Sequence, residues 1–259
     1  MKRILVLAAT FLMVASFSVR AQNVQLHYDF GKLLYQKEGK SLATRPELTT
    51  TVEMFRPDDW GSTFFFVDMN YGPLADKSQG GVLGAYWEIA RELKFWKAPV
   101  SIHVEYNGGL DVQLRKYDTV TPNIDVPYGT IYNDAWLGGV TYSYANKDFS
   151  KTFSVSAMYK AIPRNPSPHN FQLTGVWNLW FARGAILLSG FIDFWREKRD
   201  WQGTEYILLT EPQIWYNFNT IKGMGKVNLS IGSEVEISNN FVGKGFYAIP
   251  TLAVKWTFN

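Results

Sequence analysis

The sequence of 259 residues contains no cysteine and only three histidines. The absence of cysteine excludes disulfide scaffolds, cysteine-ligated zinc, thiol catalysis and lipid attachment through a cysteine. The three histidines, His27, His103 and His169, lie far apart along the chain and form no i,i+4 pair. Their spacing gives no zinc motif. We therefore expect neither a metal nor a cofactor.

Long hydrophobic runs are also lacking, apart from the first residues. Lys2 and Arg3 precede a mostly apolar stretch from Ile4 to Phe17, and the residues up to Ala21 fit a signal-peptidase site. We expect a cleaved signal peptide over residues 1–21, because the apolar stretch is shorter than the ~20 residues of a membrane-spanning helix. Beyond it, no window of about 18 uninterrupted apolar residues occurs, which excludes helical transmembrane spans.

An excess of charge of one sign is missing too. The chain has 26 basic and 23 acidic residues, but Lys2, Arg3 and Arg20 belong to the expected signal peptide, and the remaining 23 basic residues balance the acids. Nucleic-acid binding requires a positively charged surface, so we expect no nucleic-acid partner. The hydrophobic content of 46% excludes disorder as the main state.

Aromatic residues are abundant, at 16% of the chain, and apolar and polar residues alternate with a period of two. This period is typical of strands. The alternation runs through twelve segments: 24–30, 48–54, 64–71, 83–90, 100–107, 132–144, 153–160, 172–179, 186–195, 210–218, 227–237 and 248–258. Pro212 and Pro250 lie inside two of them, where each removes a backbone donor from the sheet.

The connections between these segments differ in length. Those after the even-numbered segments are short, whereas those after the odd-numbered ones are longer, most clearly Gly31 to Glu47 and Asn107 to Ile131. Outer-membrane barrels have an even number of strands, short periplasmic turns and long external loops. The pattern therefore favours a barrel with both termini on the periplasmic side.

The polar face of the segments carries many acids. These are Asp29, Glu53, Asp68, Glu88, Glu105, Asp193, Glu211, Glu234 and Glu236. Burying them in the dry core of a β-sandwich would be costly, whereas a water-filled lumen removes most of that cost. A soluble sandwich with these acids on its surface is the alternative. Trp60, Trp96, Trp201 and Trp256 lie at segment ends or in connections, where the aromatic girdles of a membrane barrel are expected.

We therefore predict an all-β protein: a closed, twelve-stranded antiparallel transmembrane β-barrel that forms a single domain over residues 22–259. It is expected in the cell outer membrane, in contact with outer-membrane lipid. The last segment alternates up to Phe258, as the final strand of such barrels does. We expect this C-terminal strand to be the part that the barrel-assembly machinery engages.

One stretch of the chain resembles a known family. The run Thr49-Thr50-Thr51-Val52-Glu53-Met54-Phe55, followed by Asp59-Trp60-Gly61-Ser62-Thr63-Phe64-Phe65-Phe66-Val67-Asp68-Met69, resembles the nucleoside-specific channel-forming outer-membrane proteins, the Tsx-like group. The resemblance covers about Leu48 to Tyr71, and elsewhere it is only general. It implies a monomeric twelve-stranded barrel with a narrow lumen that passes nucleosides.

The residues themselves agree with such a lumen. A nucleoside joins an aromatic base to a polyhydroxyl sugar, so that ring faces and hydrogen-bonding groups are expected to hold it. Phe66 and Tyr86 are candidates for stacking on the base, and Glu53, Asp68 and Glu88 for accepting sugar hydroxyls. The alternative role for each acid is structural, as a strut paired with a neighbouring strand. The full set of lumen candidates is Glu53, Phe64, Phe66, Asp68, Asn70, Tyr86, Glu88, His103, Glu105, Trp215, Glu234 and Glu236.

The sequence predicts a passive channel for small solutes and no enzyme. Two alternatives remain at this point: a plugged barrel with a structural or adhesive role, and a barrel hydrolase that acts on lipid. Ser101 and His103 share one strand face and are the only pair that the hydrolase alternative offers, but this spacing is common in strands.

Overall fold

The computed structural model describes residues 21–35, 42, 45–72, 80–116 and 125–258. Residues 1–20 of the expected signal peptide lie outside this range, and Ala21 is the first residue of a strand. The strands are β1 (Ala21–Tyr28), β2 (Leu48–Asp58), β3 (Gly61–Tyr71), β4 (Val82–Leu93), β5 (Val100–Lys116), β6 (Asp125–Ala145), β7 (Lys151–Ala161), β8 (His169–Phe181), β9 (Ile186–Arg199), β10 (Thr204–Thr210), β11 (Gln213–Asn217), β12 (Leu229–Asn239), β13 (Phe246–Pro250) and β14 (Leu252–Phe258). The described residues also form the short 3-10 turns η1 (Gly31–Tyr35), η3 (Ala182–Gly184) and η4 (Phe218–Thr220). No helix in the described part of the chain is both long and apolar enough to cross a membrane.

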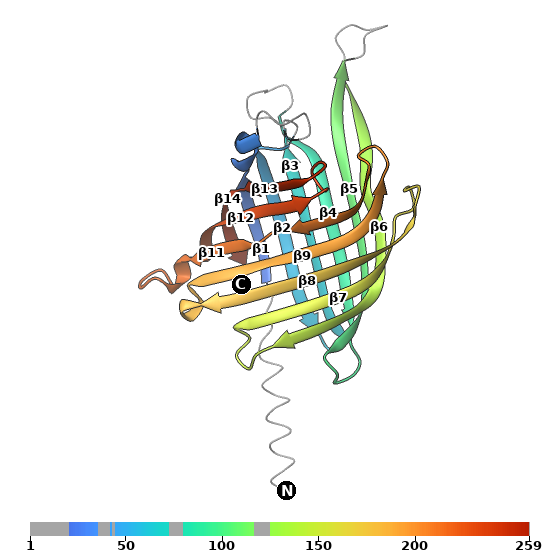
Figure 1. Cartoon of the computed structure of the whole chain (residues 1–259). Coiled ribbons are helices and arrows are strands. Elements are labelled where there is room, and N and C mark those ends of the chain that lie inside the picture. The colour runs from blue at the N-terminus through green and yellow to red at the C-terminus, as the bar shows by residue number, and fades with distance from the viewer. Residues whose placement is uncertain (1–20, 36–41, 43–44, 73–79, 117–124, 259) are drawn as a thin grey trace.

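The strands form one closed antiparallel barrel (Figure 1). Each strand from β1 to β9 pairs with its neighbour in sequence, and the ring closes because β14 pairs with both β1 and β12. The pair β10 and β11 occupies one strand position between β9 and β12, and β13 and β14 occupy another. The prediction of twelve strands in a closed barrel is therefore confirmed.

The two split strands break at the prolines singled out in the sequence. Pro212 separates β10 from β11, and Pro250 ends β13 just before β14 begins. Proline has no backbone N–H to give to a neighbouring strand, so the ladder is interrupted at each. Val235 of β12 lies between the two breaks, since its N–H donates to the Pro212 carbonyl over 3.1 Å and its register partner is Pro250.

The prediction of a long loop from Asn107 to Ile131 was wrong. Strand β5 continues to Lys116 and β6 starts at Asp125, so that these strands project beyond the rest of the barrel wall (Figure 1). A register shift between Asn107 and Gly109 displaces the alternation by one residue, which hid the continuing strand.

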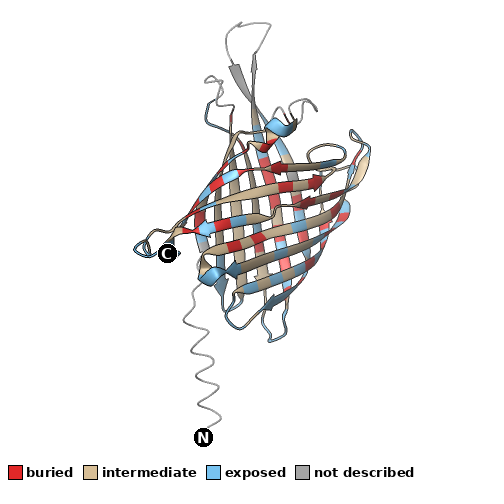
Figure 2. Cartoon of the chain, turned by 60° about the vertical axis from the view of Figure 1, so that its left-hand side comes forward, coloured by how far each residue is buried: buried red, intermediate tan, exposed pale blue. Residues whose placement is uncertain are grey.

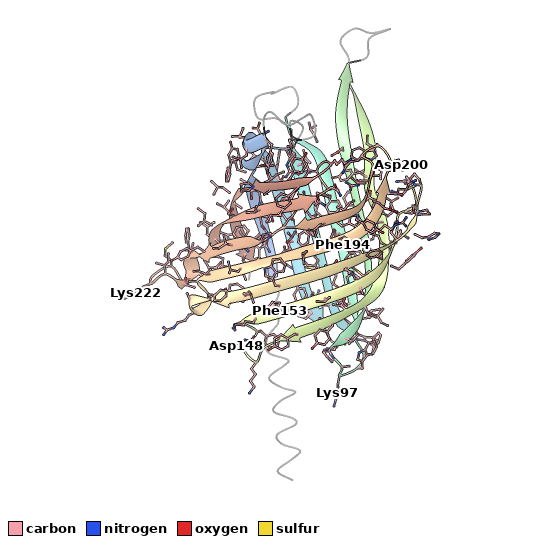
Figure 3. The ribbon with its side chains drawn as sticks, in the orientation of Figure 1. Lys97, Asp148, Phe153, Phe194, Asp200 and Lys222 are labelled. Carbon is pink, nitrogen blue, oxygen red and sulfur yellow. The ribbon has the colours of Figure 1, made fainter. Side chains whose placement is uncertain are left out.

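The expected difference in loop length holds only in part. The connection between β2 and β3 is two residues long, 59–60, and that between β1 and β2 runs from 29 to 47. However, β9 and β10 are joined by residues 200–203 alone, whereas the even connection 218–228 is longer. Lys97, Asp148 and Lys222 lie in the even connections and Asp200 lies at the opposite end of the barrel (Figure 3).

The outer face of the barrel is apolar and exposed. Along β7, outward residues such as Val155 at 59% and Tyr159 at 51% exposure alternate with inward residues such as Ser156 at 5%. Figure 2 shows buried and exposed positions side by side along several strands of the barrel. A water-soluble sandwich would place its aliphatic residues inside, so this arrangement is the inverse of a dry core.

Aromatic rings form two bands on this outer face. At the end with the short even turns lie Tyr144 and Phe153, with ring centres 6.5 Å apart, and at the other end Phe194 stacks on Tyr206 at 6.0 Å. Both Phe153 and Phe194 are labelled in Figure 3. Between the bands the outward residues are aliphatic and exposed: Val140, Val155, Leu173 and Ile192. All four tryptophans expected in girdles, Trp60, Trp96, Trp201 and Trp256, are exposed as well.

Candidate functional site

The candidate site is the inner wall of the barrel where β2, β3 and β4 run side by side. Register pairs Thr51 with Asp68, Glu53 with Phe66, and Phe66 with Glu88, so that these side chains share the inward face. The hydroxyl of Thr51 donates to Asp68 over 2.5 Å. The Asn23 amide likewise donates to Glu53 over 2.9 Å, so neutral donors hold two carboxyl groups of this wall in place.

A ladder of aromatic rings crosses this wall from strand to strand. The ring centres of Phe64 and Phe66 lie 6.0 Å apart, those of Phe66 and Tyr86 5.8 Å, and those of Tyr86 and Tyr132 6.2 Å, the last pair stacked at 21°. We call Phe64, Phe66, Tyr86 and Tyr132 the aromatic ladder. Such spacing is within the range in which rings attract one another.

Gly109 makes room for the last rung of the ladder. It lies in register between Tyr86 on β4 and Tyr132 on β6. A Cβ atom at Gly109 would come within 2.4 Å of the Tyr132 ring. The ring therefore covers the glycine, an arrangement in which an aromatic side chain shields a strand position that has none.

Carboxyl groups stand beside the ladder. The hydroxyl of Tyr86 donates to Glu88 over 2.5 Å. On β5, His103 is held between two acids, with its Nδ1 atom 2.6 Å from Glu92 and its Nε2 atom 2.9 Å from Glu105. Both ring nitrogens are thus occupied by carboxylates.

The same contacts bear on the hydrolase alternative. Ser101 donates to Glu92 over 2.5 Å and is not bonded to His103. A nucleophilic serine needs a base within hydrogen-bond reach, and here the histidine nitrogens face acids. The pair forms a structural network with Thr141, which also donates to Glu92.

The opposite part of the interior is densely packed. Trp215 is fully buried: the Lys255 ammonium lies 4.0 Å from its ring centre, and its indole N–H donates to Gln213. Ile207 and Ile249 are also fully buried inward residues. This side of the barrel is filled by its own side chains.

An ion-pair cluster ties the connection between β1 and β2 to the barrel wall. Arg45 reaches Asp29 over 2.9 Å and Glu236 over 2.8 Å, and the side chains of both acids are only 9% exposed. Burial acts to lower the pKa of the Arg45 guanidinium, but the charges of Glu236 and Asp29 and the bonds to them more than offset this and raise the pKa. The guanidinium stays charged and fixes the segment at this end of the lumen.

A cavity of about 310 Å³ opens at the other end of the interior, beside the connections 182–185 and 218–228. Its lining includes Trp180 of β8, Asn217 of β11 and Ser230 of β12. Strand register places these residues on the inward face. The cavity is large enough for a small solute and faces the end where both described chain ends lie.

The structure places all twelve predicted lumen residues on the inward face. Seven of them line the part-exposed wall of β2 to β4: Glu53, Phe64, Phe66, Asp68, Asn70, Tyr86 and Glu88. Glu234 is part-exposed, and its carboxylate accepts from Gln213 on the packed side. The others are buried in structural contacts: His103, Glu105, Trp215 and Glu236. In particular, Trp215 has no surface left for contact with a solute.

Sequence reasoning missed several interior residues. Tyr132 follows the register shift in β5, so that its inward direction does not follow from simple alternation. Lys160 and Lys255 are inward cations on strands whose other inward residues are mostly small or neutral. Their position opposite the apolar face was the available signal, since an exposed lysine on a lipid-facing strand position would be costly.

The architecture and the inner wall define the class: a closed, twelve-stranded antiparallel β-barrel with a polar interior and an apolar exterior. The chain belongs to the family described as "Domain of unknown function (DUF5020)", whose model matches residues 21–258. No curated protein matches the sequence significantly.

Solved structures with the same fold include the NanC porin, with a TM-score of 0.51, 8% sequence identity, and coverage of 92% of this chain and 100% of that one. The KdgM porin matches with a TM-score of 0.45 and 11% identity over 92% of this chain and 99% of that one. Omp33, an outer membrane protein of Acinetobacter baumannii, matches with a TM-score of 0.41 and 12% sequence identity over 93% of this chain and 98% of that one. At these identities the likeness to NanC shows the fold.

Proposed function

We propose that this protein is a passive outer-membrane channel for small solutes, with nucleosides as the solute class. Location in the outer membrane is supported by the two aromatic bands that flank an exposed aliphatic belt, since such girdles mark the two faces of a bilayer. The name of the similarly folded NanC porin agrees with a channel. The short turn 59–60 favours a periplasmic position for that end and for both termini. A single closed ring needs no second copy, so we propose a monomer.

The observation that carries the solute class is the aromatic ladder beside hydrogen-bonding carboxyl groups on one part-exposed wall. Phe66 and Tyr86 present rings to the lumen, and Asp68 and Glu88 lie next to them. Ring faces suit a base, and carboxylates accept bonds from sugar hydroxyls. Contacts of this kind are weak and repeated along the wall, as a transport path requires.

The test is single-channel current through the refolded protein in planar lipid bilayers. We expect conductance that falls when adenosine is added on either side. Phe66→Ala removes one ring of the ladder and is expected to weaken this block by up to about tenfold, because an aromatic contact contributes about 0.5–1.5 kcal/mol. The matched control is Phe153→Ala on the outer face, which should leave the block unchanged.

Asp68→Asn probes the hydrogen-bonding part of the wall. Because its carboxyl oxygen accepts from Thr51, the amide keeps the size and one acceptor, and the barrel should still fold. Folding is read from the heat-modifiable band on gels. Conductance that nucleosides leave untouched would remove nucleosides as the solute, and equal loss of the folded band in Asp68→Asn and Phe66→Ala would make these residues structural.

A second candidate function is a plugged barrel with a structural or adhesive role. The dense packing around Trp215, Ile207 and Ile249, together with the Arg45 cluster at one end, favours it. It predicts a stable folded barrel with no conductance in the same bilayers. The current measurement therefore separates the two candidates directly.

A further inference from the structure

Several positively charged side chains inside the barrel already contact acids or aromatic rings. Arg45 pairs with two acids, and His103 lies between two others. Arg199 contacts Glu197 and two backbone carbonyl groups. Lys160 lies 4.6 Å from the centre of a tryptophan ring, as Lys255 does at 4.0 Å. Among these groups, only Lys160 and Lys255 have no acid within 4.0 Å.

Several inward carboxyl groups, in contrast, have no cation beside them. Among the described residues, no basic side chain lies within 4.0 Å of the following six acids: Glu53, Asp68, Glu88, Asp111, Asp193 and Glu211. Where their bonds are seen, the partners are neutral, such as Thr174, whose hydroxyl donates to Asp193 over 2.5 Å. The six unpaired acids therefore outnumber the two unpaired lysines, Lys160 and Lys255.

An independent observation lies in the middle of this wall. Asn107 on β5 is 3% exposed, and its Oδ1 atom has no hydrogen-bond partner among the described residues. Its register partner across the sheet is Glu88, and Glu105 precedes it on the same face. A buried acceptor without a donor is costly, so the site lacks an N–H or O–H group that a ligand would bring.

The aromatic ladder completes the same patch. Tyr86 is two residues from Glu88, and Phe66 is the register partner of Glu88. Aromatic faces attract ammonium and guanidinium groups, and carboxylates and amide oxygens accept their N–H donors. Acceptors and ring faces lie together, with no cation beside Glu88.

We propose that the lumen selects cationic solutes, and that the patch of Phe66, Tyr86, Glu88 and Asn107 binds small organic cations that carry ammonium or guanidinium groups. This rests on the proposed channel function and adds small organic cations to the uncharged nucleosides as solutes of the same wall. Inorganic cations pass more readily than anions for the same reason, because the unpaired carboxylates raise the local concentration of positive charge.

The experiment measures the reversal potential of the full chain in planar bilayers of neutral lipid under a KCl gradient. We expect a reversal potential that is shifted toward the equilibrium potential of K⁺, as in a cation-selective channel. Glu88→Gln should lower the cation-over-anion permeability ratio by about six- to tenfold, because one unit charge about 6–8 Å away in water raises the local cation concentration about two- to threefold and lowers the anion concentration by the same factor. Asp148→Asn, in the turn between β6 and β7, is the matched control and should change nothing.

Organic-cation binding is read from current block by spermidine, with citrate as the matched anion. We expect block by spermidine and none by citrate. Asn107→Leu keeps the side-chain size but removes the acceptor, so it should weaken spermidine block and leave the K⁺/Cl⁻ ratio as it is. Asp193→Asn gives a second charge variant in case Glu88→Gln fails to fold.

The outcomes separate this inference from the proposed function. A conducting channel with no preference or with a preference for Cl⁻ overturns the inference and leaves the channel in place. A Glu88→Gln channel as selective as Asp148→Asn also overturns it. Absence of any conductance in the unaltered protein refutes the channel itself, and the inference with it.

Discussion

Replacing Val155 by arginine tests whether lipid or water surrounds the barrel. Val155 is the central outward residue of β7, 59% exposed, with Tyr142 and Gly175 as its register partners. It lies in the aliphatic belt between the two aromatic bands. Arginine on the lipid face of such a barrel costs about 2–4 kcal/mol at the bilayer midplane and about 0–1 kcal/mol near the interface.

The matched control is Phe149→Arg in the turn between β6 and β7. Phe149 is 67% exposed, close to the band that contains Phe153. If lipid covers the belt, Val155→Arg should lower the free energy of unfolding by about 2–4 kcal/mol and Phe149→Arg by no more than about 1 kcal/mol. In water both changes would be surface substitutions and would stay within about 0.5 kcal/mol.

The assay is denaturant unfolding of the protein refolded into phospholipid vesicles, followed by tryptophan fluorescence. The difference between the two variants is the informative quantity, because it removes effects common to any added arginine. Equal and small changes at both positions would refute the assignment of the outer face to lipid. The outer-membrane location would then lose its main support.

Three further predictions concern the interior. Gly109→Ala forces the Tyr132 ring away, because the new Cβ would lie 2.4 Å from it, and we expect a loss of about 1–3 kcal/mol in denaturant unfolding together with weaker nucleoside block. Arg45→Ala leaves two buried carboxylates without their cation, so unfolding should be easier by about 3–5 kcal/mol, and a loss below 1 kcal/mol would show that this cluster is not needed. His103→Leu removes the donor to Glu105 and leaves Glu92 with Ser101 and Thr141 alone, so it should cost about 1–3 kcal/mol in the same assay, whereas lipid hydrolysis abolished by this change would revive the hydrolase alternative.

The inward and outward residues of the barrel strands could be predicted from the sequence, because one face of each strand meets the lumen and the other meets the surroundings of the barrel. The alternation in 153–160 identified Val155 as outward and Ser156 as inward, and their exposures of 59% and 5% confirm it. The prolines at 212 and 250 likewise marked the two interrupted strands. Period-two patterning and missing backbone donors are local properties, so that they can be read without knowledge of the neighbouring strands.

The packing of side chains in the interior could not be predicted in the same way. Trp215 was expected to line the lumen, and its inward direction agrees, but its complete burial depends on Lys255, which is distant in sequence. Inward apolar residues such as Ile207 and Leu137 were not anticipated, because a polar lumen was taken as the rule for every strand. Packing across the barrel depends on side chains from many strands, which alternation along one strand does not specify.

The breaks at Pro212 and Pro250 distinguish β12 from the other strands of the barrel. It is bordered on each flank by two short pieces with a gap between them, and the gaps meet at Val235. Because the strand pairing is interrupted on both sides of β12, we expect local opening of the sheet to begin here. Amide protons near Val235 should therefore exchange with solvent before those of β7 or β8. Opening at the interrupted strand pairs beside β12 would widen the barrel locally while the other strands keep their positions.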